Sequence, residues 1–209
     1  MALDTYGGLK AEVADWLNRK DLDAKIPTFI RLLESQINRK LRTHQMMQRA
    51  TADISLDYTA LPADFKALYN CVLLTNPITK LEYMTPGDIQ ELRVTVQGTA
   101  RKPGAYSIVG STIEVAPTPD TTYSMEITYW KAIPYLDDVI NPTNWVLTQH
   151  PDLYLYGTLL QAAPYLNNDE RITTWGTAVS AIVDSINVED ERALKGGVPL
   201  KARIKPYGG

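Results

Sequence analysis

Cysteine and histidine are scarce in this chain, and their scarcity excludes several kinds of site. Of the 209 residues, one is cysteine, Cys71, and two are histidine, His44 and His150. A single cysteine cannot form an internal disulfide, which rules out a disulfide framework and favours a reducing compartment. Neither a second cysteine nor a closely spaced histidine pair is present to bind zinc. Cys71 lies in an apolar run, residues 69–74, so we expect a buried, unreactive thiol.

The sequence also lacks the short motifs of common enzymes. We find no glycine-rich phosphate loop, no dinucleotide-binding glycine pattern and no Gly-x-Ser-x-Gly nucleophile elbow. His150 precedes Pro151 at an expected helix start, where a structural or capping role is the simpler interpretation. Adjacent acidic residues are expected to be solvated surface groups rather than catalytic pairs. They are Asp137-Asp138, Asp169-Glu170 and Glu189-Asp190-Glu191. We therefore expect no enzymatic activity, no metal and no cofactor.

Long apolar runs and a strong net charge are absent as well. No run approaches the roughly 20 residues that a membrane helix needs. The N-terminus has no charged start followed by an apolar core, so no signal peptide is predicted. The apolar share of 44% and the charged share of 22% are ordinary for a globular protein. A net charge of −3 argues against a surface that binds nucleic acid generally. We expect synthesis in the cytosol and no membrane association.

Helical periodicity dominates the two ends of the chain. Three stripes of apolar residues recur at helical spacing: Leu9, Val13, Trp16 and Leu17; Ile30, Leu33, Ile37 and Leu41; Ile172, Trp175, Val179, Ile182 and Ile186. Pro27 suits the first turn of the second helix, and Asn167 to Asp169 would cap the last one. The basic cluster of Arg39, Lys40, Arg42 and His44 at the end of the second helix favours interaction with the helix dipole. Phosphate binding is the alternative.

The middle of the chain, residues 50–132, has the composition of strands. Residues 105–109 and 112–115 flank Gly110-Ser111, which predicts a hairpin with a two-residue turn. Tyr123, Met125, Ile127 and Tyr129 share one face of a further strand. Four or five such strands predict a small antiparallel sandwich or barrel. The predicted fold class is α+β: a helical bundle from residues 1–49 and 133–195, an inserted β-domain, and an extended tail, residues 196–209. Residues 133–151 are expected to be a linker.

The tail alternates with a period of two. Val198, Leu200, Ala202 and Ile204 alternate with Lys201, Arg203 and Lys205. This is the period of a β-strand with one apolar and one basic face. Pro199 and Pro206 prevent continuation of the preceding helix. A terminal strand without a sequential partner needs a sheet edge elsewhere, which favours an assembly component. Pairing with its own domain and fraying in solvent are the alternatives.

Several segments, taken in order, resemble one known family. They are Ile26-Pro27, the helix with Glu34, Arg39, Leu41 and Arg42, and residues 61–65, 81–86, 107–117, 127–131 and 150–157. In this order, they resemble the head-to-tail adaptor (connector) proteins of tailed bacteriophages, over roughly residues 1–195.

The resemblance implies a structural virion protein in the head-tail neck. Its copies would form a ring, commonly a dodecamer, beneath the portal protein. The ring would extend the DNA channel, through which DNA passes without specific binding, and would offer a platform to a tail or nozzle protein. The tail would then bind the portal or a neighbouring copy through Val198, Leu200, Lys201, Arg203, Ile204, Lys205 and Tyr207.

Three alternatives remain open from the residues. The first is a tail-completion or tail-nozzle component of the same particle. The second is a particle-associated cell-wall hydrolase that uses a carboxylate such as Glu114 or Glu126. The third is a sugar-binding β-domain that presents Tyr106, Tyr123, Tyr129 or Trp130, although aromatic residues at alternate strand positions are more simply explained by packing.

Overall fold

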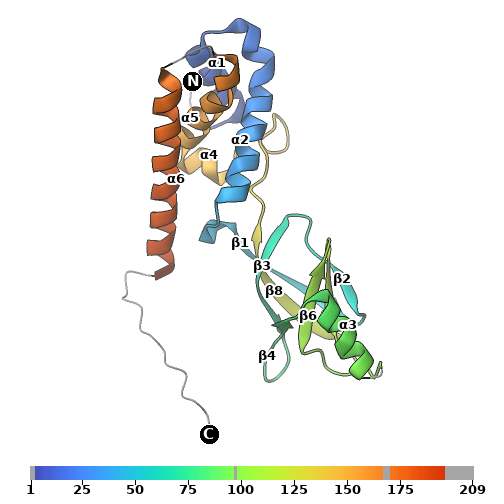
Figure 1. Cartoon of the computed structure of the whole chain (residues 1–209). Helices are drawn as coiled ribbons and strands as arrows, with labels where there is room; N and C mark the ends of the chain where they lie inside the picture. The colour runs from blue at the N-terminus through green and yellow to red at the C-terminus, as the bar shows by residue number, and fades with distance from the viewer. Residues whose placement is uncertain (1–2, 97, 167–169, 196–209) are drawn as a thin grey trace. The chain divides into compact units, whose positions relative to one another are not determined.

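The computed structural model describes residues 3–96, 98–166 and 170–195. These residues form two compact units (Figure 1). One unit, which we call the helical unit, contains the residues up to His44 and those from Ile133 onward. The other, Gln45–Ala132, is the β unit. Helices and two sheets occur together, which confirms the α+β class.

The helical unit is organised around one short, central helix. Its helices are α1 (Tyr6–Leu17), α2 (Ile26–Lys40), α4 (Trp145–Gln149), α5 (Pro151–Gln161) and α6 (Arg171–Lys195), with 3₁₀ turns η1 (Lys20–Lys25) and η3 (Ala163–Tyr165). The 3₁₀ turn η2 (His44–Met46) spans the boundary between the two units along the chain. α5 packs against each of the other four helices, so both ends of the sequence contribute to one core. Leu9, Leu33 and Leu153 are among its fully buried side chains. Because burial of apolar surface drives folding, this shared core holds the distant segments together.

Two local expectations for the helices need correction. Trp16 was placed on the buried stripe of α1, but it is 39% exposed and packs edge-on against Tyr156, with ring centroids 5.9 Å apart. The segment expected to be a linker contains α4, whose first turn is capped because the Asn144 side chain accepts a hydrogen bond from the Leu147 N–H. The expected cap at Asn167 to Asp169 lies outside the described residues.

The β unit contains two four-stranded sheets. The strand order in the first sheet is β1 (Met47–Ile54), β8 (Tyr123–Lys131), β3 (Phe65–Leu73), β4 (Thr79–Lys80). The strand order in the second sheet is β2 (Tyr58–Ala60), β7 (Thr112–Ala116), β6 (Ala105–Val109), β5 (Glu82–Tyr83). The sheets share one hydrophobic core, to which β8 contributes Met125, Ile127 and Tyr129 as predicted. Eight strands are described rather than the expected four or five. The β5–β6 pair is parallel, contrary to the expected antiparallel pairing.

Local chemistry fixes two parts of the β unit, a hairpin and the start of a helix. β6 and β7 form the expected hairpin, and Gly110 has a φ of 60°, a conformation that glycine adopts without strain. Helix α3 (Pro86–Thr95) begins after Thr85, whose side chain accepts the Asp88 N–H while the Asp88 carboxylate accepts the Thr85 N–H. This reciprocal capping fixes the start of α3.

Candidate interaction surfaces

Helix α2 holds the chain segment that enters the second half of the helical unit. Asn38 makes two hydrogen bonds to Ile133: its Oδ1 accepts the N–H at 2.8 Å, and its Nδ2 donates to the C=O at 3.0 Å. One helical turn earlier, Glu34 Oε1 accepts the Leu136 N–H at 2.7 Å. Residues four apart lie on one face of a helix, so Glu34 and Asn38 together fix residues 133–136.

The Glu34 carboxyl is buried, and burial raises its pKa to about 7, against the lowering effect of the hydrogen bonds from Leu136 and Tyr154. The Tyr154 hydroxyl lies 3.3 Å from Glu34 Oε1 and accepts a hydrogen bond from Asn144 Nδ2 at 2.7 Å. Burial, followed by the neighbouring Glu34, raises the pKa of Tyr154. Glu34, Tyr154 and Asn144 thus connect α2, α5 and the start of α4 through polar contacts inside the core.

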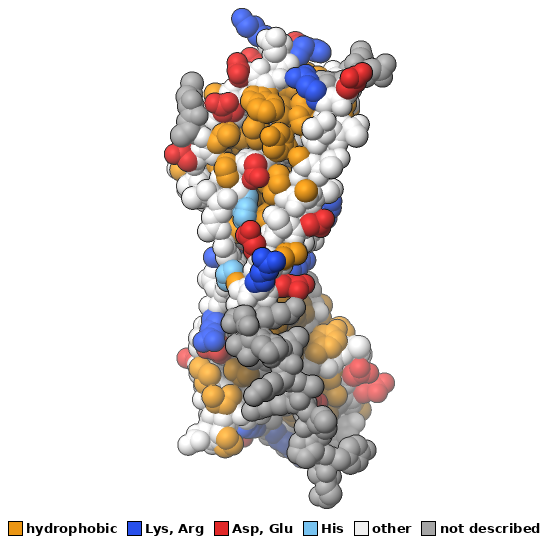
Figure 2. Space-filling view, turned by 90° about the vertical axis from the view of Figure 1, so that its left-hand side faces the viewer, with side chains coloured by type: hydrophobic (Ala, Val, Ile, Leu, Met, Phe, Trp, Pro, Cys, Tyr) orange, Lys and Arg blue, Asp and Glu red, His pale blue; other side chains and the backbone are white. Residues whose placement is uncertain are grey.

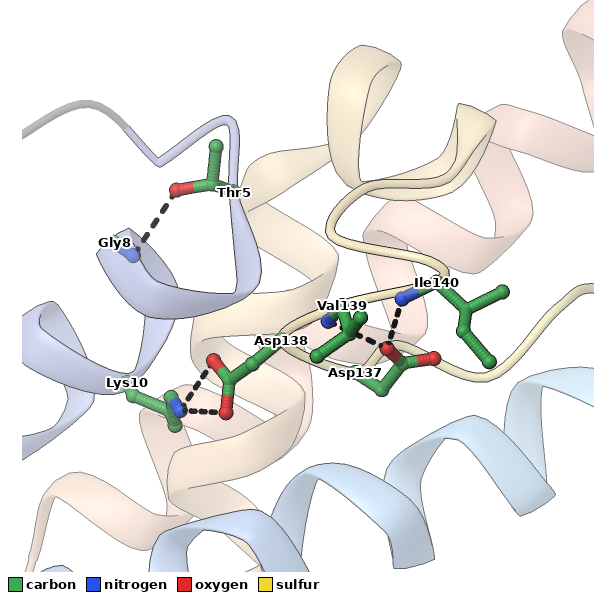
Figure 3. A network of polar contacts seen from close by, with 7 residues as sticks. All are labelled: Thr5, Gly8, Lys10, Asp137, Asp138, Val139 and Ile140. Atoms are coloured by element: carbon green, nitrogen blue, oxygen red, sulfur yellow. Dashed lines mark hydrogen bonds and ion pairs between the residues drawn. The ribbon is translucent and has the colours of Figure 1, made fainter.

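The segment after this polar network carries an ordered loop with an apolar tip (Figure 3). The Asp137 carboxylate accepts the N–H groups of Val139 at 2.7 Å, Ile140 at 2.5 Å and Asn141 at 3.2 Å. These backbone hydrogen bonds lower the pKa of Asp137. Asp138 accepts a hydrogen bond from Lys10 at 2.7 Å, which ties the loop to α1. Val139 and Ile140 are 86% and 81% exposed.

This loop has the features of a contact point for another molecule. Two adjacent exposed aliphatic side chains give a partner apolar surface to remove from water. A loop whose backbone is already ordered loses less conformational entropy on binding. Figure 2 also shows hydrophobic side chains gathered on the helical unit, on the side where α6 lies in Figure 1. The helical unit therefore offers more than one apolar surface.

The acidic and histidine residues have definite structural roles. Asp190 was expected to be solvated, but it is 8% exposed, and its Oδ1 accepts the backbone N–H of His44 at 2.6 Å and lies 2.5 Å from His44 Nδ1. This contact joins the start of η2 to α6. His150 makes no side-chain cap for α5 and lies against the Trp145 ring, with centroids 6.4 Å apart. A structural role for His150 fits this contact, whereas the capping role does not.

The basic cluster at the end of α2 serves the helix terminus in part. Arg42 Nη1 donates hydrogen bonds to the carbonyls of Asn38 and Leu41, at 3.2 Å and 2.7 Å. These carbonyls lie at the C-terminal end of α2, where cations are favoured by the dipole. Arg39 and Lys40 are exposed. The hydrogen bonds of Arg42 are therefore explained by its position at the end of α2, and no bound phosphate is needed to explain them.

The two carboxylates considered for hydrolysis are not arranged as a catalytic pair. Glu114 is 2% exposed, and its Oε1 lies 2.6 Å from Arg93 Nη1 and 3.2 Å from Gln90 Nε2, both on α3. Glu126 lies on β8 opposite Thr51, on the face directed away from the core residues Met125 and Ile127. A glycosidase needs two carboxyls facing each other across a cleft. Glu114 instead anchors α3 to its sheet.

The aromatic residues of the β unit pack rather than form a sugar platform. Tyr129 is 1% exposed and donates a hydrogen bond to Asp64 at 2.9 Å. Tyr106 and Tyr123 are packed against the same core. Trp130, on the other face of β8, packs edge-on against Tyr69. Cys71 is buried as expected, and burial raises the pKa of its thiol to about 12.

Two further findings bear on the range of possible sites. No group of three histidine, cysteine, aspartate or glutamate side chains within the described ranges could hold a metal ion. None of the helices in the described part of the chain has the length and hydropathy that crossing a bilayer requires. The predicted tail contacts, Val198, Leu200, Lys201, Arg203, Ile204, Lys205 and Tyr207, lie outside the described residues.

Comparison with known proteins completes this description. A search of curated proteins gave no match. Among models of protein families, the SU10 adaptor protein matches residues 4–202. The match covers nearly the whole chain, including both units and the first residues of the tail, and it confirms the resemblance to phage head-to-tail adaptors that the sequence suggested. The chain belongs to the SU10 adaptor protein family.

Proposed function

We propose that this protein is the head-to-tail connector of a tailed bacteriophage. Its copies form a ring beneath the portal protein, extend the DNA channel and provide the platform on which the tail is attached. The family match over residues 4–202 carries this proposal, because the family consists of structural phage adaptors. The ordered loop with exposed Val139 and Ile140 supports it, since an assembly component needs surfaces that a partner covers.

The proposal includes a finer architecture and a set of partners. The helical segments act as a bundle that carries an inserted β-domain, and the tail extends from it. The partners are the portal protein, a tail or nozzle protein and further copies of the chain, in a ring that we expect to be dodecameric. The protein resides in the head-tail neck of the virion, catalyses no reaction, needs no cofactor and lets genomic DNA pass without specific contacts.

The tail is the proposed docking segment. Its alternation of apolar and basic residues suits strand addition to a sheet edge of the portal or of a neighbouring copy. One added strand is a modest contact, because a backbone hydrogen bond contributes about 0.5–1.5 kcal/mol net. Repetition around a ring multiplies such contacts, since each bound copy raises the effective concentration of the next.

Co-sedimentation with portal rings from the same genome tests the proposal. We compare the full-length chain with one that ends at Lys195, and we verify that both are folded by circular dichroism. A matched control replaces Gly208 and Gly209 with serine, which changes the tail without changing its alternating segment. We expect the full-length chain and the control to sediment with the rings and the shortened chain to stay in solution.

Two other outcomes have clear meanings. If the shortened chain sediments as well as the full-length chain, the tail has no part in docking. If no form sediments with portal rings, the portal interface is wrong, and the same assay with tail-tube particles would test a tail-completion or nozzle role.

A further inference from the structure

One edge of the β unit is open in the described chain. β1 is eight residues long, ends its sheet and pairs with β8 alone among the strands described. Its register with β8 is continuous, without a bulge, and β1 contains no proline. On the same side, the other sheet ends in β2, which has three residues. An unprotected edge strand of this length is a template for a further strand.

An apolar slot lies between these two edges. Its cavity of about 210 Å³ has small residues at the rim, Ala50, Ala52 and Ala60, and core residues at its base, Ile113, Met125 and Ile127. Ala50 and Ala52 face the core from β1, opposite Ile127 and Met125. Because alanine fills little space, the core is incompletely covered here. The cavity is smaller than the roughly 300–1,000 Å³ of small-molecule sites, which favours the side chains of an extended segment.

The chain itself contains a segment of matching chemistry. In residues 200–205, Leu200, Ala202 and Ile204 alternate with Lys201, Arg203 and Lys205. Pro199 precedes it, and proline is tolerated at the first position of a strand. A strand added beside β1 would direct one of its faces toward the slot and the other toward the outer face of the sheet.

Charge on the outer face fits the basic side of this segment. Asp53 and Thr51 lie on the outward side of β1, and Glu126 on β8 lies opposite Thr51. Arg49 adds one positive charge on the same face. Lys201, Arg203 and Lys205 would therefore approach two carboxylates and one guanidinium, a net attraction at the rim that complements apolar contact in the slot.

We propose that residues 200–205 of a second copy pair with β1 as an added strand and place Leu200 and Ile204 in the slot. The inference rests on the proposed ring and names the contact between neighbouring copies. Each copy would then have one donor and one acceptor on different surfaces, which is the heterologous arrangement from which closed rings are built. Residues 196–199, which link α6 to this strand, span at most about 14 Å when extended, so the proposal requires the neighbour's slot to lie near the C-terminal end of α6.

A disulfide cross-link between two full-length variants tests this contact. The acceptor carries Thr51→Cys together with Leu200→Asp and Ile204→Asp, so its own tail cannot enter a slot. The donor carries Ala52→Trp, which fills its own slot, together with one tail cysteine. That cysteine is Arg203→Cys in one donor and Lys201→Cys in another, because the added strand can run in either direction along β1. Both are mixed on portal rings and oxidised mildly. Cys71 is buried and leaves the new cysteines as the reactive pair.

We expect a disulfide-linked adduct of one donor and one acceptor. Adding Ala52→Trp to the acceptor should abolish the adduct. Adding Arg49→Trp, a matched change on the opposite face of β1, should preserve it. An intramolecular disulfide in a dilute single chain that carries Thr51→Cys and Arg203→Cys would mean that the slot takes the tail of its own chain, and it would overturn the proposal.

Failure of this contact and failure of the proposed function are distinguishable. Sedimentation of the wild-type chain and of the mixture with portal rings is measured in parallel. If the mixture sediments but neither tail cysteine cross-links, the slot is not the acceptor, although the connector function stands. If the mixture does not sediment, whether or not the wild-type chain does, the cross-link is measured in concentrated solution without portal, where an adduct still supports the contact and its absence contradicts it.

Discussion

At the residue scale, the buried Glu34 makes the stability of the helical unit depend on pH. Its pKa is raised from the usual 4.5 to about 7, so the folded chain holds a proton that the unfolded chain has released between these values. Stability must therefore fall as the pH rises through this window and level off above about 7. A shift of this size corresponds to at most about 3 kcal/mol.

Glu34→Gln should remove this dependence. Glutamine keeps an oxygen that can accept the Leu136 N–H but does not titrate. We compare the free energy of unfolding of the variant with that of the wild type at each pH. The difference, variant minus wild type, should rise by about 2–3 kcal/mol between pH 4.5 and pH 8. Urea unfolding followed by circular dichroism at 222 nm measures the difference, and the outward-facing Glu126→Gln is the control. Parallel pH profiles for wild type and Glu34→Gln would contradict the assignment.

A second residue-scale prediction concerns the ion pair under α3. Glu114→Gln removes the nearer of two carboxylate charges beside the partly buried Arg93 and leaves Asp57 at 3.6 Å, so we expect a loss of stability below the roughly 3 kcal/mol of a fully broken buried pair, about 1–2 kcal/mol. The matched Glu126→Gln should change the stability by less than about 0.5 kcal/mol, since it is a surface substitution. Thermal unfolding monitored by near-ultraviolet circular dichroism compares them. Equal melting temperatures for the two variants would show that Glu114 does not anchor α3.

At the element scale, α2 and α5 approach closely at one glycine. A Cβ atom on Gly157 would lie 2.5 Å from Cδ1 and 2.8 Å from Cδ2 of Leu33, which is itself buried. Overpacking costs typically about 1–3 kcal/mol, more than the roughly 1 kcal/mol that alanine gains over glycine in a helix. The close contact between the helices therefore depends on this residue.

Gly157→Ala should consequently destabilise the chain, by up to about 2 kcal/mol after the helix-propensity gain is subtracted. Gly176→Ala, within α6, is the matched control, because the nearest atom to its new Cβ would be 4.0 Å away. We expect this control to stabilise by up to about 1 kcal/mol. Chemical denaturation of both variants gives the comparison. The prediction fails if Gly157→Ala is as stable as Gly176→Ala.

Elements set by local chemistry were predicted well. The β6–β7 hairpin and the alternating faces of β8 follow from residues within a few positions of one another. α4 was missed because five residues are too few to show helical periodicity. The parallel β5–β6 pair was missed because a two-residue strand leaves no pattern in the sequence.

The candidate interaction surfaces were less predictable, because they depend on distant residues. Glu34 meets Leu136 across 102 positions, and Asp190 meets His44 across 146. Asp190 lies between Glu189 and Glu191, and a run of acidic residues predicts a solvated surface, so the burial of Asp190 could not be inferred. The exposure of Val139 and Ile140 was also missed, since neighbouring apolar residues suggest burial. The aspartate two and three positions before them was the available signal of a turn.

At the scale of the whole molecule, each unit has its own core, so a destabilising substitution in one unit should leave the stability of the other unit unchanged. Hydrogen exchange measured by mass spectrometry on the full chain can test this. Gly157→Ala should speed exchange in α2 and α5 and leave residues 45–132 protected. Glu114→Gln should do the reverse. Equal loss of protection in both units for either variant would show that the chain unfolds as one cooperative body.

The pairing of β1 with β8 has a consequence for how such chains can be rearranged. Met47, near the start of the β unit, lies opposite Trp130, near its end. The points where the chain enters and leaves this unit are therefore neighbours in one antiparallel ladder. A segment with adjacent ends can be excised, exchanged or transplanted as a cassette, with a short bridge closing the gap and no rethreading of the remaining chain. Recombination between related genes could replace the whole β unit in a single event.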